Sequence, residues 1–133
     1  MNKKNLLSTL WILAALNYLF RFVFSLYFGE RLAELLDGNL HGMPVTQGLL
    51  LGMSVMMEIP IVMILLSRLL NHKPNRILNI IIPLVVGAVH LSSMFSEGVT
   101  LHFYFFSMIG TIIYISIVGI AYQWKEDDGP SAH

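Results

Sequence analysis

The stretch Gln47–Leu70, QGLLLGMSVMMEIPIVMILLSRLL, decides the fold of this chain. It carries only two charged residues, Glu58 and Arg68. As an α-helix rising about 1.5 Å per residue, it is long enough to cross a hydrocarbon layer of about 30 Å. A helix on the surface of a soluble protein has a broad polar face, and this stretch has almost none. It therefore predicts a membrane-spanning helix.

Three further apolar runs have similar length, at Leu7–Tyr27, Ile77–Phe95 and Leu101–Trp124. Membrane-spanning strands are about 10 residues long and alternate with period two, a pattern that these runs lack. The composition agrees, because 56% of the residues are hydrophobic and only 12% are charged, against about 25% charged in soluble domains. We predict a single all-α domain over residues 1–124, an integral membrane four-helix bundle with up-down-up-down topology.

The longest connection, Phe28–Thr46, contains a segment with helical character. Within it, Glu30–Asp37 places apolar and charged residues at helical spacing, and Gly38 follows. This pattern predicts a short helix that lies on the membrane surface and ends at Gly38. The other two connections, 71–75 and 96–99, are short and polar.

The basic residues near the helix ends are distributed very unevenly. One side of the predicted bundle would carry Lys3, Lys4, Arg68, Lys73, Arg76 and Lys125, and the other only Arg31. Basic residues favour the cytoplasmic side, so both termini are predicted to be cytoplasmic, including a disordered polar tail at 125–133. The first run is longer than the apolar core of a signal peptide and contains Asn17 and Arg21, so we expect it to remain as a helix.

Three ionisable residues fall inside the predicted spans: Arg21, Glu58 and His90. Each costs about 2.5–3.5 kcal/mol at mid-membrane, so each is expected to face the bundle interior and to find a partner. Their positions along the runs place them in one layer between the midplane and the outer half. We predict an Arg21–Glu58 ion pair with His90 within reach. The pair would either fix the helix register or form a ligand or proton site.

Other polar side chains recur at helical spacing in the same layer. The full set of candidate ligand-binding or proton-carrying residues is Arg21, Glu58, His90, Asn17, Ser54, Thr111 and Tyr114. Direct pairs can hardly satisfy all their donors and acceptors, which predicts a polar cavity that opens towards the outside. Pro60 and Pro83 would also release the carbonyl groups of Met56 and Asn79 as polar partners.

Motifs for other kinds of chemistry are missing from the sequence. It has no Gly-rich phosphate loop and no H-E-x-x-H zinc motif, so no catalytic residue is predicted. There are no cysteines, and the remaining histidines share no metal-ligand spacing, so neither a metal site nor a cofactor is expected. The formal net charge is zero, so no overall field attracts nucleic acid. The lipid bilayer is the expected partner.

Several short blocks resemble a known family. The blocks are Leu10–Leu19 (LWILAALNYL), Met57–Pro60 (MEIP), and Leu65–Arg68 (LLSR) followed by Asn75-Arg76. They resemble a domain-of-unknown-function family of small bacterial four-helix integral membrane proteins. The resemblance implies a bacterial cytoplasmic (inner) membrane protein, and it implies no particular activity.

Three functional hypotheses follow from these residues. The leading one is a small membrane protein that binds a small molecule or a partner protein through the interior polar cluster. The second is a component of a transporter or proton relay, working as a homo-oligomer or with a membrane partner because four helices alone enclose little pathway. The third is a membrane-embedded enzyme that acts on a quinone or lipid, which the lack of a catalytic motif disfavours.

Overall fold

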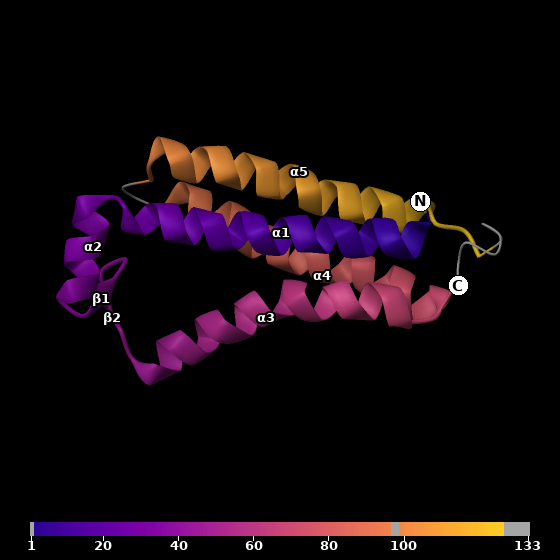
Figure 1. Cartoon of the computed structure of the whole chain (residues 1–133), viewed down its shortest axis with the longest axis horizontal. Coiled ribbons are helices and arrows are strands. Elements are labelled where there is room, and N and C mark those ends of the chain that lie inside the picture. Colours follow the sequence, from indigo (N-terminus) through magenta and orange to yellow (C-terminus); the bar gives the residue numbers. More distant parts are fainter. Residues whose placement is uncertain (1, 97–98, 127–133) are drawn as a thin grey trace.

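The computed structural model describes residues 2–96 and 99–126, which leaves Glu97, Gly98 and most of the predicted tail outside the described residues. Four long helices dominate it: α1 (Lys3–Leu26), α3 (Gln47–Leu69), α4 (His72–Ser92) and α5 (Leu101–Gln123). They alternate in direction, so that the chain enters and leaves the bundle at one end, here called the termini end (Figure 1). All four are long and apolar enough to cross a membrane. The predicted all-α bundle of four spans is confirmed.

Local chemistry explains where the helices begin. Asn2 caps α1, because its side-chain oxygen accepts a hydrogen bond of 2.8 Å from the backbone N–H of Asn5. The helix α4 begins at His72, five residues earlier than the predicted Ile77. Pro74 lies in its first turn, where the missing N–H of proline breaks no helical hydrogen bond. The predicted polar turn at 71–75 is therefore mostly the first turn of a helix.

A small substructure lies at the opposite end of the bundle, here called the hairpin end. It consists of α2 (Gly29–Leu36) and the two short antiparallel strands β1 (Asn39–Leu40) and β2 (Met43–Pro44). The short helix is confirmed, and its position on a membrane surface stays a prediction. The hairpin was not predicted. Its two turn residues, His41 and Gly42, have φ angles of +52° and +74°, which suit a tight turn between twisted strands.

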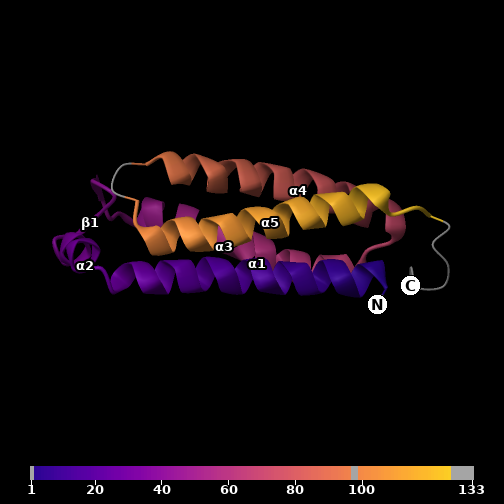
Figure 2. The same ribbon diagram turned by 90° about the horizontal axis from the view of Figure 1, so that it is seen from above.

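The helices do not pack as a closed ring. The packing order is α3–α1–α5–α4, because α1 contacts both α3 and α5, and α5 contacts α4. Figure 2 shows α5 running between α1 and α4. Although α3 and α4 are consecutive in the chain, they make few contacts with each other. The bundle is therefore weakly packed along one side.

This weak packing is concentrated in the half of α3 nearer the hairpin end. The buried residues of α3 are Pro60, Met63 and Ser67, which all lie in its second half. Figure 1 shows the first half diverging from the other helices. Pro60 cannot donate a hydrogen bond to the carbonyl of Met56, so the helix can bend at this point. The main core cluster includes Leu7, Trp11, Ala14, Met63, Val86, Ile113, Tyr114, Ile117 and Trp124.

Candidate functional site

A buried arginine lies in the hairpin half of the bundle. Arg21 is about 8 Å from the end of α1, and only 8% of its side chain is exposed. Its Nη1 lies 3.1 Å from Nδ1 of His90 and 3.3 Å from the hydroxyl of Ser107. The guanidinium carbon stands 4.8 Å from the ring centre of Tyr18 and 4.7 Å from that of Phe103. Neutral groups from α1, α4 and α5 thus hold the cation in place.

His90 is the residue that fixes this arginine. Its Nε2 lies 3.0 Å from the backbone carbonyl oxygen of Ser107, which can only accept a hydrogen bond. The proton of the ring therefore lies on Nε2, and Nδ1 accepts from Arg21. With these two bonds, His90 is a neutral imidazole that positions the guanidinium between α4 and α5.

Within the described residues, no carboxylate pairs with Arg21. The one salt bridge between described residues joins Arg31 and Glu34 at the hairpin end, at 3.0 Å. Nη1 of Arg21 makes two hydrogen bonds, to His90 and to Ser107, and the Tyr18 side chain also interacts with the guanidinium. A buried charge without a counterion is costly. An arginine whose partners are all neutral can accept an anion as its counterion.

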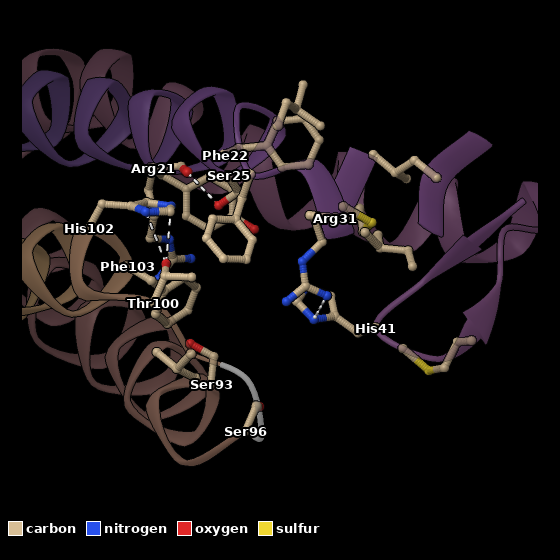
Figure 3. Close-up of a pocket in the computed structure, with 18 of the residues that line it drawn as sticks. Arg21, Phe22, Ser25, Arg31, His41, Ser93, Ser96, Thr100, His102 and Phe103 are labelled. Carbon is tan, nitrogen blue, oxygen red and sulfur yellow. Dashed lines mark hydrogen bonds between the residues drawn. The ribbon is translucent and has the colours of Figure 1, made fainter. Parts of the chain in front are cut away.

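Two cavities meet at Arg21. The first, here called the vestibule, has a volume of about 380 Å³ and lies between the end of α1, the start of α5 and the hairpin. Figure 3 shows Arg21, Phe103 and His102 on one side of it, and Arg31 and His41 on the other. No described residue lining the vestibule is acidic. Of the seven residues predicted to surround a polar cavity, Arg21 alone lines the vestibule, and the opening of this cavity to the outside of the membrane stays a prediction.

The second cavity, here called the lateral cleft, has a volume of about 480 Å³. It occupies the space left where the first half of α3 diverges from α4. Its polar lining residues are Tyr18, Arg21, His90, Ser93 and Tyr114, and its other walls are apolar, including Leu49, Met53, Met56, Val86 and Val89. Arg21 lines both cavities, together with Tyr18, Leu49, Met53 and Ser93.

The charges at the rim of the vestibule are already compensated. Glu34 accepts a hydrogen bond from the backbone N–H of Gly42 and pairs with Arg31, and these contacts lower the pKa of Glu34. Arg31 also lies 3.0 Å from Nδ1 of His41. Partial burial, and then the charge of Arg31, lower the pKa of His41. The rim cation thus has a carboxylate partner, whereas Arg21 has none among the described residues.

The structure brings five of the predicted site residues into one layer. Arg21 and His90 are in direct contact, and Tyr114 packs its ring against His90 at a centroid distance of 5.7 Å. Asn17 donates a 2.9 Å hydrogen bond to the carbonyl of Phe106, and Thr111 donates to that of Ser107. Tyr114 lines the lateral cleft, whereas Asn17 and Thr111 line neither of the two cavities at Arg21.

A glycine on α5 allows this close packing. A Cβ atom placed on Gly110 would lie 2.9 Å from Nε2 of His90 and 3.0 Å from Nδ2 of Asn17. Both distances are shorter than carbon atoms normally approach such groups. Gly110 therefore lets two polar side chains reach the backbone of α5, a role that the sequence analysis did not identify.

The predicted Arg21–Glu58 ion pair is wrong, and so is the interior position of Ser54. Both Glu58 and Ser54 are exposed on the face of α3 that points away from the bundle. Ser54 bonds only the carbonyl of Leu50 in its own helix, at 2.8 Å. The physical reason is helical phase, because Glu58 precedes the buried Ser67 by about two and a half turns and so faces the opposite side.

A second polar cluster, here called the inner network, lies in the termini half and consists of Trp11, Ser67, Asn75 and Asn79. All four side chains are fully buried. The Trp11 ring N–H donates to Asn79 at 2.7 Å, Asn79 donates to Asn75 at 2.7 Å, and Asn75 donates to the carbonyl of Ser67 at 2.7 Å. The spacing of Asn75 and Asn79, one helical turn apart, is the signal that could have revealed it.

No group of three or more metal-ligating side chains occurs in residues 2–96 and 99–126.

Comparison of the whole chain with known proteins identifies its family. Comparison with curated proteins and with solved structures finds no match. The model of one family, described as the family of unknown function DUF6326, matches residues 1–131. The chain therefore belongs to this family of unknown function.

Proposed function

We propose that this protein spans the cytoplasmic membrane and binds an anionic amphiphile. The charged head group would pair with Arg21, and the apolar chain would lie in the lateral cleft. The observation that carries the proposal is the position of Arg21, buried without a described carboxylate partner where a basic cavity meets an apolar one.

The head group would bind from the vestibule. The guanidinium of Arg21 carries N–H groups beyond the two hydrogen bonds of Nη1, and such groups match the two oxygens of a carboxylate or phosphate. His90 and Ser107 hold the guanidinium from the other side, so little conformational freedom is lost on binding. A charge-assisted contact of this kind contributes about 1.5–3 kcal/mol. Arg21 is thus the expected source of selectivity for anions.

The apolar chain would enter between α3 and α4. The walls of the lateral cleft are mostly apolar, and α3 and α4 make few contacts with each other. An acyl chain that enters from the bilayer exchanges one apolar environment for another, so the cleft would hold it through close packing and not through removal from water. A ligand dissolved in the bilayer could reach Arg21 sideways without crossing the hairpin end.

The orientation of the site follows from the basic residues. Residues Lys3, Lys4, Arg68, Lys73 and Arg76 all belong to the termini end, which supports a cytoplasmic location for both termini. The vestibule would then open to the outside. Reporter fusions at His133 and next to Asn39 test this: we expect a cytoplasmic signal at His133 and an external signal at Asn39. The reverse result would place the vestibule in the cytoplasm.

Binding is tested with the purified chain in lipid nanodiscs and three probes of matched chemistry. Dodecanoate carries both head group and chain, dodecanol carries the chain alone, and acetate carries the head group alone. We expect dodecanoate to bind most tightly. Arg21→Gln should weaken it by about 10- to 100-fold, which corresponds to the loss of one charge-assisted contact, and should leave dodecanol unchanged.

Arg31→Gln is the matched control, because Arg31 lines the same vestibule but is already paired with Glu34. Its effect on dodecanoate should be much smaller than that of Arg21→Gln. Equal affinities for dodecanoate and dodecanol, or unchanged binding in Arg21→Gln, would contradict the proposal. Native mass spectrometry of protein purified without added ligand would show whether the natural occupant is a free acid or an anionic phospholipid.

A further inference from the structure

Glu58 is the central residue of α3, with equal lengths of helix on either side. It is exposed on the face that points away from the bundle, and it has no hydrogen bond or ion pair with any described residue. Ser54 and Gln47 are exposed on the same face, so they form a polar stripe with Glu58. In a membrane-spanning α3, Glu58 would face lipid at mid-depth, at a cost of about 2.5–3.5 kcal/mol for an acidic residue.

We propose that a second copy of this chain covers this face. The two α3 helices would pack in parallel, with the two Glu58 side chains opposite each other. The apolar part of the interface would come from the strongly exposed residues beside the stripe, including Leu51, Val55, Val62 and Leu65.

Symmetry favours a second copy over other occupants. A two-fold axis perpendicular to the membrane places each residue of α3 opposite its own equivalent at the same depth. A protonated carboxyl carries both a donor and an acceptor, so two of them satisfy each other, as polar side chains do between membrane helices. The Glu58 carboxyl of each chain then satisfies its equivalent in the other chain, and no further polar residue is needed.

Among the described residues, the other faces of the bundle carry mostly apolar side chains at mid-length, as with Leu16 on α1, Leu84 on α4 and Ile112 on α5. The partly exposed hydroxyl of Ser116 on α5 already donates to the carbonyl of Ile112. Docking α3 of one copy against the apolar faces of α1 or α4 would leave Glu58 unsatisfied. Of these arrangements of the described residues, α3 packed against α3 is the one that takes the Glu58 carboxyl out of contact with lipid.

The inference is independent of the proposed ligand site, because Glu58 lies on the opposite side of α3 from the buried Ser67. The chain has no native cysteine, so single cysteines report clean disulfide cross-links. Leu51→Cys and Leu65→Cys lie two turns before and after Glu58 on the same face. We expect oxidation in native membranes to give cross-linked dimers of both variants, and at least tenfold less dimer from Leu84→Cys on the exposed face of α4.

Variants of Glu58 then test whether this residue causes the dimer to form. In the Leu65→Cys background, Glu58→Leu should reduce cross-linking at least tenfold, whereas Glu58→Gln, which keeps a donor and an acceptor, should retain most of it. Glu58 makes no contact within its own chain that folding needs, and unchanged thermal stability of the monomer in detergent checks this. Efficient cross-linking in Glu58→Leu, equal cross-linking of Leu84→Cys, or none at Leu51→Cys and Leu65→Cys would each overturn the proposal. The last result would point to a partner of another kind.

Discussion

The inner network and the Arg21 site are both polar layers inside one apolar bundle, and they differ in what their groups bind. In the inner network, Trp11, Asn75 and Asn79 donate to one another or to the backbone, and all are fully buried. At the other layer, Arg21 has neutral partners and no carboxylate among the described residues, and its side chain lines two cavities. Within this bundle, the fully bonded layer is therefore structural, and the layer beside the two cavities is the candidate binding site.

Helix packing produces this difference. In the termini half, α3 buries Met63 and Ser67 against the bundle and closes the layer that contains Asn79. In the hairpin half, α3 buries no residue before Pro60. The Arg21 layer thus has three packed helices around it and an opening where the fourth would close it.

The largest effect on stability is expected from Asn79→Leu. Leucine is similar in size but removes the acceptor of the Trp11 N–H and the partner of both Asn75 and Ser67. Each buried polar group left unsatisfied costs about 1–3 kcal/mol. We expect the free energy of unfolding to fall by about 2–4 kcal/mol in a reversible SDS titration, with dodecanoate affinity unchanged in the folded fraction.

Ser54→Ala serves as its control, because that exposed hydroxyl bonds only its own helix, and it should change stability by less than about 0.5 kcal/mol. If Asn79→Leu were equally mild, the inner network would not be the stabilising layer, and the contrast between the two regions would fail.

A smaller effect is expected from Gly110→Ala. The new methyl group would lie against His90 and Asn17 at about the distances measured for a Cβ, 2.9 and 3.0 Å. Overpacking of this kind costs about 1–3 kcal/mol, and moving His90 should also weaken dodecanoate binding. Gly119→Ala on the same helix meets no atom within 4 Å, so it should be neutral or stabilising by up to about 1 kcal/mol. Similar behaviour of the two variants would mean that α5 can move away from the Arg21 layer without cost.

His90→Ala should weaken binding as well as stability, because the buried imidazole bonds both Arg21 and the carbonyl of Ser107. Without the imidazole, Nη1 of Arg21 loses a fixed acceptor, and a neutral hydrogen bond contributes about 1 kcal/mol. Dodecanoate binding should weaken by about fivefold while dodecanol binding stays the same. His90→Asn, which keeps an amide oxygen as acceptor, should recover part of the loss. An equal loss for both probes would mean that His90 supports the cavity by packing and does not position Arg21.

The smallest effect concerns the hairpin and pH. The pKa values of His41 and Glu34 are lowered in the folded protein from 6.5 and 4.5, so the unfolded segment binds protons at higher pH than the folded one. Protection of the hairpin amides from hydrogen exchange should therefore fall as the pH drops below about 6.5, and again below about 4.5. His41→Asn should remove the first step, since asparagine tolerates the left-handed turn position. Glu34→Gln should remove the second. Protection that rises on acidification would contradict the predicted sign.

The sequence was sufficient for the spans and for part of the site. Long apolar runs located the four helices, and helical spacing located α2. Arg21 and His90 were assigned to one layer because ionisable residues avoid lipid, and the structure brings them to 3.1 Å. The same rule failed for Glu58. It assumes that every polar residue of a membrane helix faces the interior of its own chain.

The rotation of α3 could not be predicted, for a physical reason. Nearly all its residues are apolar, so hydrophobic periodicity does not mark an inward face, and only the stripe of Gln47, Ser54 and Glu58 gave a direction. The inward face instead consists of Pro60, Met63 and Ser67, whose small or apolar side chains carry little signal. The inner network was missed because the sequence analysis placed Asn75 in a polar turn, on account of the preceding Lys73-Pro74 pair.

The lateral opening between α3 and α4 also determines how a ligand would be supplied. A site entered from within the bilayer draws on a two-dimensional reservoir, in which the relevant quantity is the mole fraction of the amphiphile among the lipids. At a fixed total amount of ligand, adding lipid vesicles would dilute that reservoir and empty the site, although the intrinsic affinity is unchanged. Occupancy would then follow the composition of the membrane more directly than the concentration in the surrounding water.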